Sequence, residues 1–561
     1  MEKYLVTVKK GVDINEFYDD METPGGSSTI PGRKVDCYDR RPISRNTGYI
    51  LSEEEVIELK NDSRIIGIEP QSILDSMIVR PTWTQTSSDW DKSSTSTNTN
   101  RNWGLYRCVN GEQVSNWGSD GTVDATSTIT TTSSGKNVDV VIVDGHLNIN
   151  SPEFAVNDDG TGGTRVQQFN WLSLTSIVTG GENGTYTYRS GASLNNGDDN
   201  HGQHVAGTVA GNTQGWARDA NIYYMSPYDS ASSTTIASDR LFEYIRAWHN
   251  SKSINASTGR RNPTIVNSSW ASRYPVIRSS ITSIVHRGAN YTSGFTDNDF
   301  QNTYGIRYFN ATHVYPKAYI VAGYVADIED AVDDGIIFVG AAGNESEKID
   351  IEGGTDYNNY FLGKLQGGND TIYAFYYHRG SWATAATVSG VNGARLSVCV
   401  GAISSLVNES KADFSNCGPR VDVYSPGYYI ISSLQSSGGG VTLVDDYRDS
   451  NYKLGKYDGT SMASPQVCGV LACLLEQYPN MNQSDIMSYL EQNSKTNQMT
   501  TTSGGYNDDT DIQGSSNSYL FYKKERVETG TPTPRYTYSA RKASTNGVKY
   551  PRINSSVTKR L

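Results

Sequence analysis

Four short apolar runs lie in the middle of the chain, and stretches with a helical pattern separate them. The apolar runs are residues 138–143, 264–266, 336–339 and 396–400, and the helical stretches include residues 235–250 and 319–334. Short apolar runs that alternate with helices are typical of a parallel sheet that is buried on both faces. We therefore predict an α/β fold, a doubly wound and mostly parallel sheet with helices on both faces.

Residues 1–80 have a different pattern, in which short strand-like segments flank one helix. Ser52 followed by three glutamates predicts the start of that helix, because serine caps helix N-termini and acidic side chains favour their positive end. The pattern indicates a small α+β domain. Residues 81–101 are rich in Ser, Thr and Asn, the composition of an exposed linker.

Polar residues follow the apolar runs. Asp144 ends the first run and Asn344 follows the third, while His201 and Ser461 each stand at the start of a helix. Because sites in parallel sheets form at the carboxyl ends of the strands, we expect these four side chains to lie together. His204, one turn after His201, is expected to be a packed helix residue.

A carboxylate, an imidazole, a hydroxyl and an amide donor are the groups that acyl transfer requires. The hydroxyl is a weak nucleophile at neutral pH, so a base must take its proton. A carboxylate then fixes the tautomer of the base, and hydrogen-bond donors stabilise the oxyanion. The chain order Asp144, His201, Ser461 is the order found in subtilisin.

Six blocks of sequence resemble the subtilisin family of serine proteases, and they occur in the order found in that family. They are VIVDGHLNINSPEF (141–154), HGQHVAG (201–207), NSSWA (267–271), FVGAAGNE (338–345), ADFSNCGPRVDVYSPG (412–427) and GTSMASP (459–465). A chance match to one block is common, whereas six blocks in order are not. The resemblance implies a serine endopeptidase that acts on polypeptide substrates and requires no cofactor for catalysis.

The resemblance also implies a role for each matching residue. Ser461 would be the nucleophile, His201 the general base and acid, and Asp144 the group that orients His201. Asn344 and the Ser461 backbone N–H would form the oxyanion hole. The residues implied in substrate binding are Ser269, Trp270, Ala271, Ala342, Gly343 and Glu345.

Three departures from the family pattern concern the shape of the site. Gly145 and His146 replace the residues that usually follow the catalytic aspartate, Gln203 replaces a threonine, and Trp270 replaces a smaller apolar residue. We expect His146 to be a surface-loop residue and Gln203 to alter the substrate subsites. Glu345 beside the oxyanion asparagine suggests a weak preference for a basic residue before the scissile bond.

The same family comparison divides the chain into regions. Residues 1–80 resemble an inhibitory propeptide, which implies a self-processing precursor cut between about Arg80 and Arg101. The predicted regions are 1–80 (propeptide-like domain), 81–101 (linker with the processing site), 102–495 (catalytic domain with inserts at 272–317 and 346–393) and 496–561 (polar linker and basic C-terminal extension). The Tyr-rich inserts are interpreted either as surface elaborations or as a binding rim.

Composition limits the partners. The net charge is −12, with 36% hydrophobic and 19% charged residues, and residues 521–561 carry ten Lys and Arg against two Asp and Glu. An acidic chain argues against global nucleic-acid binding. The basic tail is interpreted as a peripheral extension in preference to an arm that contacts nucleic acid or an acidic surface. No run of about 18 apolar residues predicts a membrane helix.

Further expectations concern metals, location and a rival function. No spacing for a zinc site is found, six cysteines make no disulfide framework, and the family resemblance implies structural calcium as an option. The N-terminus lacks the apolar region of a signal peptide, so cytoplasmic synthesis is expected, and a viral or phage-associated protease is a hypothesis. The rival function is a catalytically silent scaffold protein with the same fold.

Overall fold

The structure is a computed structural model, and its described residues fall into two compact units, residues 1–81 and 82–526. The described residues are 1–9, 12–24, 33–40, 46–70, 83–85, 102–111, 129–167, 169–178, 197–226, 228–229, 234–236, 241–270, 276–306, 312–314, 322–364, 372–380, 395–404, 409–435 and 443–522. Ala271, most of the predicted linker and residues 523–561 lie outside them.

The first unit is a small antiparallel sheet with two helices, one more than the sequence pattern predicts. Its elements are β1 (Glu2–Val8), α1 (Ile14–Glu22), β2 (Asp36–Arg40), β3 (Asn46–Leu51), α2 (Glu53–Leu59) and β4 (Ile65–Pro70), and the strand order is β2-β3-β1-β4. Ser52 and Glu55 form a capping box at the start of α2. Phe17 and Met21 of α1 pack with Tyr49 of β3 in one apolar core.

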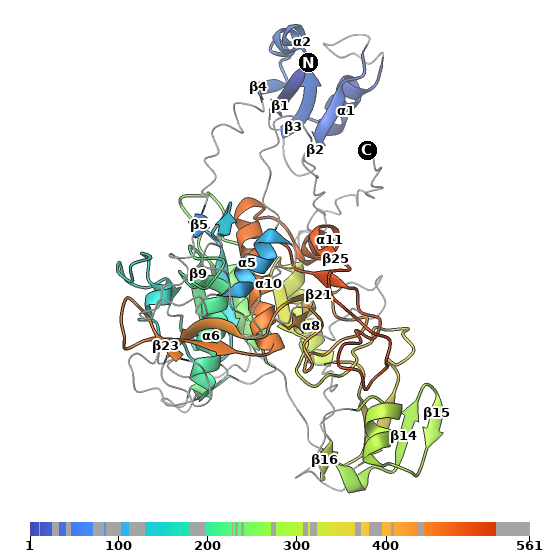
Figure 1. Ribbon diagram of the computed structural model, residues 1–561. Helices are drawn as coiled ribbons and strands as arrows, with labels where there is room; N and C mark the ends of the chain where they lie inside the picture. Colours follow the sequence, from blue (N-terminus) through green and yellow to red (C-terminus); the bar gives the residue numbers. More distant parts are fainter. Residues whose placement is uncertain are drawn as a thin grey trace. The chain divides into compact units, whose positions relative to one another are not determined.

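The second unit contains a nine-stranded sheet (Figure 1). Its strands, in spatial order, are β25 (Lys495–Thr496), β26 (Ser518–Tyr519), β21 (Val423–Pro426), β20 (Val398–Ile403), β17 (Ile337–Ala341), β12 (Thr264–Ser268), β7 (Asp139–Val143), β9 (Asn221–Met225) and β8 (Val166–Gln167). All neighbours except β25 and β26 are parallel. The four predicted apolar runs are β7, β12, β17 and β20, so the mostly parallel sheet is confirmed.

Helices cover both faces of this sheet. The main helices of this unit are α5 (Trp103–Asn110), α6 (Gly197–Ala210), α7 (Leu241–Ser251), α8 (Ala322–Asp333), α10 (Thr460–Gln477) and α11 (Gln483–Asn493). Thr264 and Asn267 of β12 face opposite sides, because residues three apart on a strand do so. Thr264 lies 2.8 Å from His249 of α7, whereas Asn267 accepts a hydrogen bond from Ser464 of α10 at 2.8 Å. The doubly wound arrangement is therefore confirmed.

A smaller sheet lies against α6. It contains β22 (Ile430–Leu434), β24 (Lys453–Tyr457) and β23 (Leu443–Asp445), in that spatial order. His204 of α6 donates from Nε2 to the carbonyl oxygens of Ile430 and Gly455, at 2.8 and 3.1 Å. The expectation that His204 is a packed helix residue is confirmed, since its side chain is fully buried.

The sheet continues beyond the predicted end of the catalytic domain. Tyr519 of β26 pairs with Tyr424 of β21, and both Tyr519 and Leu520 are fully buried. Arg107 of α5 lies over the Tyr519 ring, 3.9 Å from its centroid. The predicted boundary at residue 495 is therefore too early, because the strands at 495–496 and 518–519 are too short to leave a periodic signal in the sequence.

The two predicted inserts form one body. The sheet has the order β15 (Ala289–Tyr291), β14 (Ser283–His286), β18 (Tyr360–Gly363) and β19 (Tyr373–Tyr376), so β14 from the first insert pairs with β18 from the second. This body has its own apolar core, which includes Tyr304 and Tyr377. Some of the tyrosines that suggested a binding rim therefore serve as packing residues.

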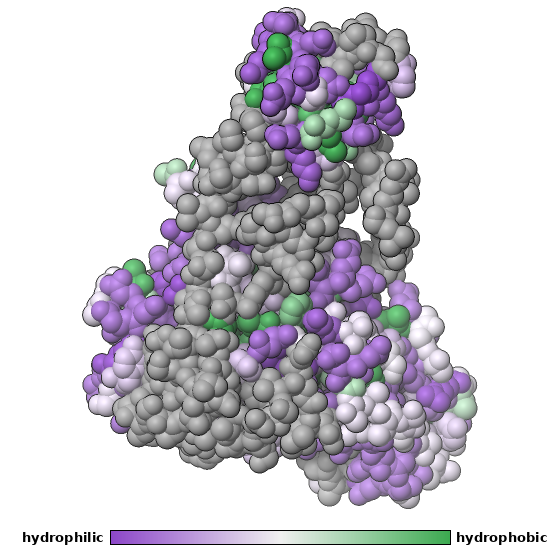
Figure 2. Space-filling model, turned by 45° about the horizontal axis from the view of Figure 1, so that its top comes forward, coloured by the Kyte–Doolittle hydropathy of each residue, from purple (hydrophilic) through white to green (hydrophobic). Residues whose placement is uncertain are grey.

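The visible surface agrees with the polar composition. Figure 2 shows a face on which hydrophilic residues predominate among those described, with hydrophobic residues in small groups. None of the helices in the described ranges is both long and apolar enough to cross a bilayer.

Candidate active site

The predicted catalytic residues come from elements on either side of a switch point in the main sheet. β7 and β12 are neighbours, and the strand order leads from β7 to β9 on one side and from β12 to β17 on the other. Asp144 directly follows β7, Ser269 directly follows β12, and Asn344 comes three residues after β17. His201 lies in α6 and Ser461 in the first turn of α10. Parallel α/β sheets bind ligands at this edge.

Asp144 and His201 form a hydrogen-bonded pair. Nδ1 of His201 lies 2.8 Å from Oδ1 of Asp144, which also accepts the backbone N–H of Gly145 at 2.8 Å. The carboxylate is buried, whereas the imidazole side chain is 35% exposed. Because a carboxylate can only accept, Nδ1 carries the proton and Nε2 carries the lone pair that a base requires.

Gly202 allows this pair to form. A Cβ atom at Gly202 would lie 2.5 Å from the backbone oxygen of Gly145, closer than real contacts allow. The missing side chain therefore lets α6 approach the loop that carries Asp144.

Ser461 lies at the start of the buried helix α10. Its hydroxyl donates to the backbone oxygen of Ser269 at 3.1 Å, and the Ser269 hydroxyl donates to the backbone oxygen of Ser461 at 3.1 Å. Gly459, just before the helix, has φ of 150°, a conformation that side chains rarely adopt. The N-terminal end of a helix favours negative charge, which suits a site where an oxyanion develops.

Contacts with Thr460 determine which way the Asn344 amide points. The backbone N–H and the hydroxyl of Thr460 both donate to Oδ1 of Asn344, each at 2.8 Å. Since a backbone N–H requires an acceptor, the oxygen of the amide must occupy this position. Nδ2 then lies on the side of Gly459, where a Cβ atom would be 3.4 Å from it. Asn344 thus presents a donor beside Ser461.

The implied substrate-binding residues lie around this group, except Ala271, which is outside the described residues. Ser269 and Trp270 follow β12, and Ala342 and Gly343 lead from β17 to Asn344. Backbone groups of Ala342 and Gly343 bond to Val400, Thr460 and Asn416. No substrate contact tests these assignments, which stay predictions.

Glu345 is more enclosed than a simple surface charge. It is 6% exposed, and its carboxylate accepts a hydrogen bond from Nδ2 of Asn416 at 3.1 Å. Oδ1 of Asn416 in turn accepts the backbone N–H groups of Glu345 and Glu347. Asn416, which the sequence analysis did not single out within its ADFSNCG motif, therefore fixes the segment after Asn344.

Two of the three departures from the family pattern have structural roles that the sequence analysis did not predict. His146 is 2% exposed and lies 5.9 Å from the ring of Tyr224, so the expectation of a surface-loop residue is wrong. Gln203 is fully buried; it accepts the backbone N–H of Asn148 at 2.9 Å and donates to Ser433 at 2.9 Å. It therefore connects the loop after Asp144 to α6.

Burial changes the protonation of the second histidine in α6. Complete burial lowers the pKa of His204 to about 3, although hydrogen bonds to two backbone oxygens partly oppose this. His204 is therefore neutral near pH 7 and does not act as a base beside His201. Within the described ranges, no group of three or more His, Cys, Asp or Glu side chains is placed to hold a metal ion.

Known proteins match parts of the chain. Subtilisin-like protease 4 of Trichophyton rubrum is 31% identical over 174 residues, which are 29% of this chain and 35% of that protein. Subtilisin-like protease 3 of Trichophyton equinum is 42% identical over 80 residues, which are 14% of this chain and 16% of that protein. The chain thus covers about a third or less of these relatives.

Two solved structures are similar to the present one. A cold-adapted subtilisin-like serine proteinase has a TM-score of 0.42 and 18% identity, with coverage of 75% of this chain and 98% of that one. Proteases from Pseudoalteromonas arctica have a TM-score of 0.37 and 19% identity, with coverage of 69% and 89%. A family model with the description "Subtilase family" matches residues 135–516. This range includes Asp144, His201, Asn344 and Ser461. This match covers more than half of the chain, and the chain therefore belongs to the subtilase family.

Proposed function

We propose that the protein is a serine endopeptidase that is made as a self-processing precursor. The observation that carries this proposal is the Asp144–His201 pair, 2.8 Å apart, at the sheet edge where Ser461 and Asn344 also lie. A carboxylate-bound imidazole has the correct tautomer to act as a base. Membership of the subtilase family supports the same reaction.

The reaction would follow from the roles of these groups. The Ser461 hydroxyl turns from the Ser269 carbonyl toward Nε2 of His201, which takes its proton as the oxygen attacks the substrate carbonyl. Asn344 Nδ2 and the Ser461 backbone N–H stabilise the oxyanion. His201 then protonates the leaving amine, and water repeats the sequence to release the acid.

Substrate binding would use the strand end beside Ser461. Ser269 and Trp270 follow β12, so an extended peptide placed there would add to this segment by main-chain hydrogen bonds. The preference of Glu345 for a basic residue remains part of this proposal, although its carboxylate already accepts a bond from Asn416.

The first unit is proposed as the inhibitory propeptide, and processing is expected upstream of Asn102. The backbone N–H of Asn102 donates to Oε1 of Gln214 at 2.9 Å, and Asn102 is fully buried. Cleavage immediately before Asn102 would place a charged amine at this buried position, which is unfavourable. We therefore expect the new N-terminus to precede Asn102.

Two measurements test this proposal. A fluorophosphonate probe should label the wild-type protein at Ser461 and should not label Ser461→Ala. N-terminal sequencing of the purified wild type should find a start between residues 81 and 101, while Ser461→Ala should retain Met1. A wild-type chain that neither reacts with the probe nor loses its first residues would favour the scaffold protein.

A further inference from the structure

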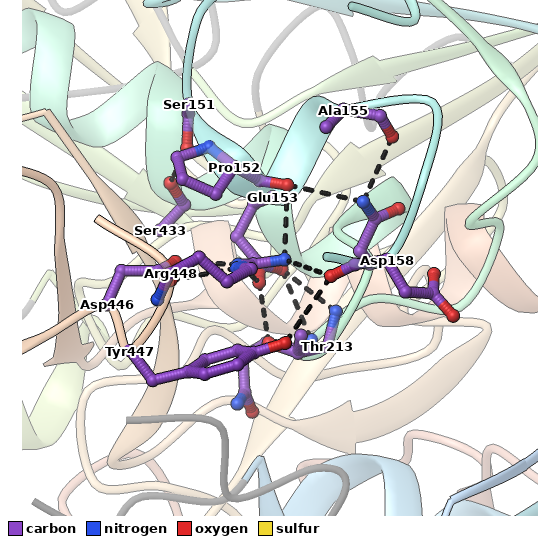
Figure 3. Close-up of polar contacts among 12 residues, drawn as sticks. Ser151, Pro152, Glu153, Ala155, Asp158, Thr213, Ser433, Asp446, Tyr447 and Arg448 are labelled. Atoms are coloured by element: carbon purple, nitrogen blue, oxygen red, sulfur yellow. Dashed lines mark hydrogen bonds and ion pairs between the residues drawn. The ribbon is translucent and has the colours of Figure 1, made fainter. Parts of the chain in front are cut away.

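A buried charged network connects three segments of the second unit. Figure 3 shows Glu153, Arg448 and Asp446 together with the residues around them. The side chains of all three are at most 2% exposed. Glu153 lies nine residues after Asp144, whereas Arg448 and Asp446 lie in the connection between β23 and β24.

Glu153 connects the segment after Asp144 to the turn that ends α6. Its Oε1 accepts the hydroxyl of Thr213 at 2.5 Å, and its Oε2 accepts the backbone N–H groups of Thr213 and Gln214 at 3.1 and 3.3 Å. Thr213 and Gln214 lie three and four residues after the end of α6, the helix that carries His201. The network thus joins the two segments that supply the Asp144–His201 pair.

Arg448 connects the same segment to the smaller sheet. Its Nη2 donates to Oε1 of Glu153 at 2.5 Å, and its Nη1 donates to the backbone oxygens of Pro152 and Asp158 at 3.1 and 3.2 Å. Asp446 accepts Nε and Nη2 of Arg448 at 2.8 and 2.6 Å. One guanidinium therefore holds three groups of the segment 152–158.

The charges in this network depend on one another. Burial would raise the pKa of Glu153, but the positive charge of Arg448 and the hydrogen bonds from Thr213 outweigh burial and lower it. Burial raises the pKa of Asp446. Arg448 is therefore the group that keeps Glu153 ionised, and an ionised carboxylate can accept from all of its donors.

We propose that Arg448 and Glu153 are positioning residues, which hold the segment after Asp144 against α6 so that Asp144 meets His201. This inference rests on the proposed function. Gln203 fixes this segment at Asn148, four residues after Asp144, and the Arg448–Glu153 link fixes it again at its far end. Attachment at separate points opposes rotation of the segment about any one of them. Neither residue touches the substrate.

Glu153→Gln tests the link selectively. The glutamine oxygen can accept the two backbone N–H groups, and the Thr213 hydroxyl can turn to accept the glutamine amide. The glutamine amide nitrogen is itself a donor, and it faces the Nη2 donor of Arg448. The hydrogen bond between Arg448 and residue 153 is therefore the only one that is lost. We expect kcat for a peptide substrate to fall about tenfold or more, with KM changed by less than about twofold, because misplacement impairs proton transfer more than binding.

Arg246→Ala is the matched control. Arg246 pairs with Asp330 and Asp334 in an exposed ion pair between α7 and α8, so its loss removes an arginine without reaching the Asp144 segment. Its kcat and KM are expected to stay within about twofold of the wild type, since exposed ion pairs contribute little.

A double variant separates positioning from folding. Arg448→Met leaves both Glu153 and Asp446 buried without their positive partner, which is strongly destabilising. Adding Glu153→Gln to Arg448→Met should raise the melting temperature of the single variant without restoring kcat. If the double variant regains both kcat and stability, the proposal is wrong. It is also wrong if Glu153→Gln alone keeps the wild-type kcat.

Labelling of the wild-type protein distinguishes a failure of the proposed function from a failure of the positioning proposal. If fluorophosphonate fails to label the wild type at Ser461, the proposed function fails. If the wild type is labelled and the folded Glu153→Gln variant is labelled at the same rate, only the positioning proposal fails. Labelling slowed about tenfold or more, with unchanged thermal unfolding, supports it.

Discussion

The orientation of the Asn344 amide follows from its neighbour Thr460. A side-chain amide can turn either its oxygen or its nitrogen toward a contact, and the two donors from Thr460 require the oxygen. A donor is thereby left facing Gly459 and the start of α10. Thr460 thus fixes in advance the amide orientation that the proposed oxyanion hole requires.

Asn344→Ala should lower kcat about 100- to 1,000-fold with little change in KM, because the lost donor acts mainly on the oxyanion. This magnitude is the one recorded for the corresponding donor in subtilisin, a member of the same family. Steady-state kinetics on a peptide substrate would measure it. Asn358→Ala is the control, since Asn358 is exposed and bonds to Arg379. A kcat for Asn344→Ala within about threefold of that control would contradict this role.

Residue types could be predicted more readily than contacts. Asp144, His201, Asn344 and Ser461 were predicted because each stands in a family motif, either after an apolar run or at the start of a predicted helix. His146 was misplaced because the burial of a loop residue depends on packing against Tyr224, which is distant in sequence. Hydrogen bonds such as those of Asn344 depend on side-chain directions, which no residue pattern reveals.

At the scale of elements, strands with continuous apolar runs were predicted, whereas strands of two residues were not. β7, β12, β17 and β20 are continuous apolar runs, so their type and parallel arrangement could be predicted. β25 and β26 contain two residues each, and they form only because β21 offers an edge for pairing. Such strands are determined by the tertiary structure.

A chain that ends at residue 495 should unfold at a lower temperature or fail to remain in solution. It lacks the buried residues Tyr519, Leu520 and Tyr522. Burial of each side chain contributes about 1.5–3 kcal/mol to the free energy of unfolding. It also uncovers the buried pair of Arg107 and Glu409. Thermal unfolding and soluble yield would be compared with a chain that ends at residue 526. Equal melting temperatures would refute the assignment of 496–522 to the folded unit.

At the scale of the whole molecule, two buried histidines make stability depend on pH. Burial lowers the pKa of His204 to about 3 and that of His378, in the insert body, to about 4. An unfolded histidine has a pKa of about 6.5, so the unfolded chain binds protons that the folded chain does not. The stabilising contribution of these histidines is therefore fully present above about pH 6.5. It decreases as the pH falls toward the lowered pKa values of the folded protein.

We expect each histidine to reduce the free energy of unfolding by about 1.4 kcal/mol per pH unit below about pH 6. His204→Gln should remove the contribution of His204, because its amide can donate to a backbone oxygen but does not titrate. Urea unfolding between pH 7 and about 4.5, with Ser461→Ala in every variant to prevent self-digestion, would measure the slopes. His313→Gln, at a partly exposed position, is the control. If the free energy of unfolding depends on pH equally steeply in His204→Gln and in the His313→Gln control, His204 does not contribute to the pH dependence of stability.

The insert body has a consequence for how the chain can be cut or shortened. β14 and β18 pair directly although strand β17 of the main sheet lies between them in the sequence. A single break in either insert would not release the body, because the other insert still connects it to the sheet. Deletion of one insert alone would leave an unpaired strand edge, which favours aggregation. We therefore expect the two inserts to be removable only as a pair.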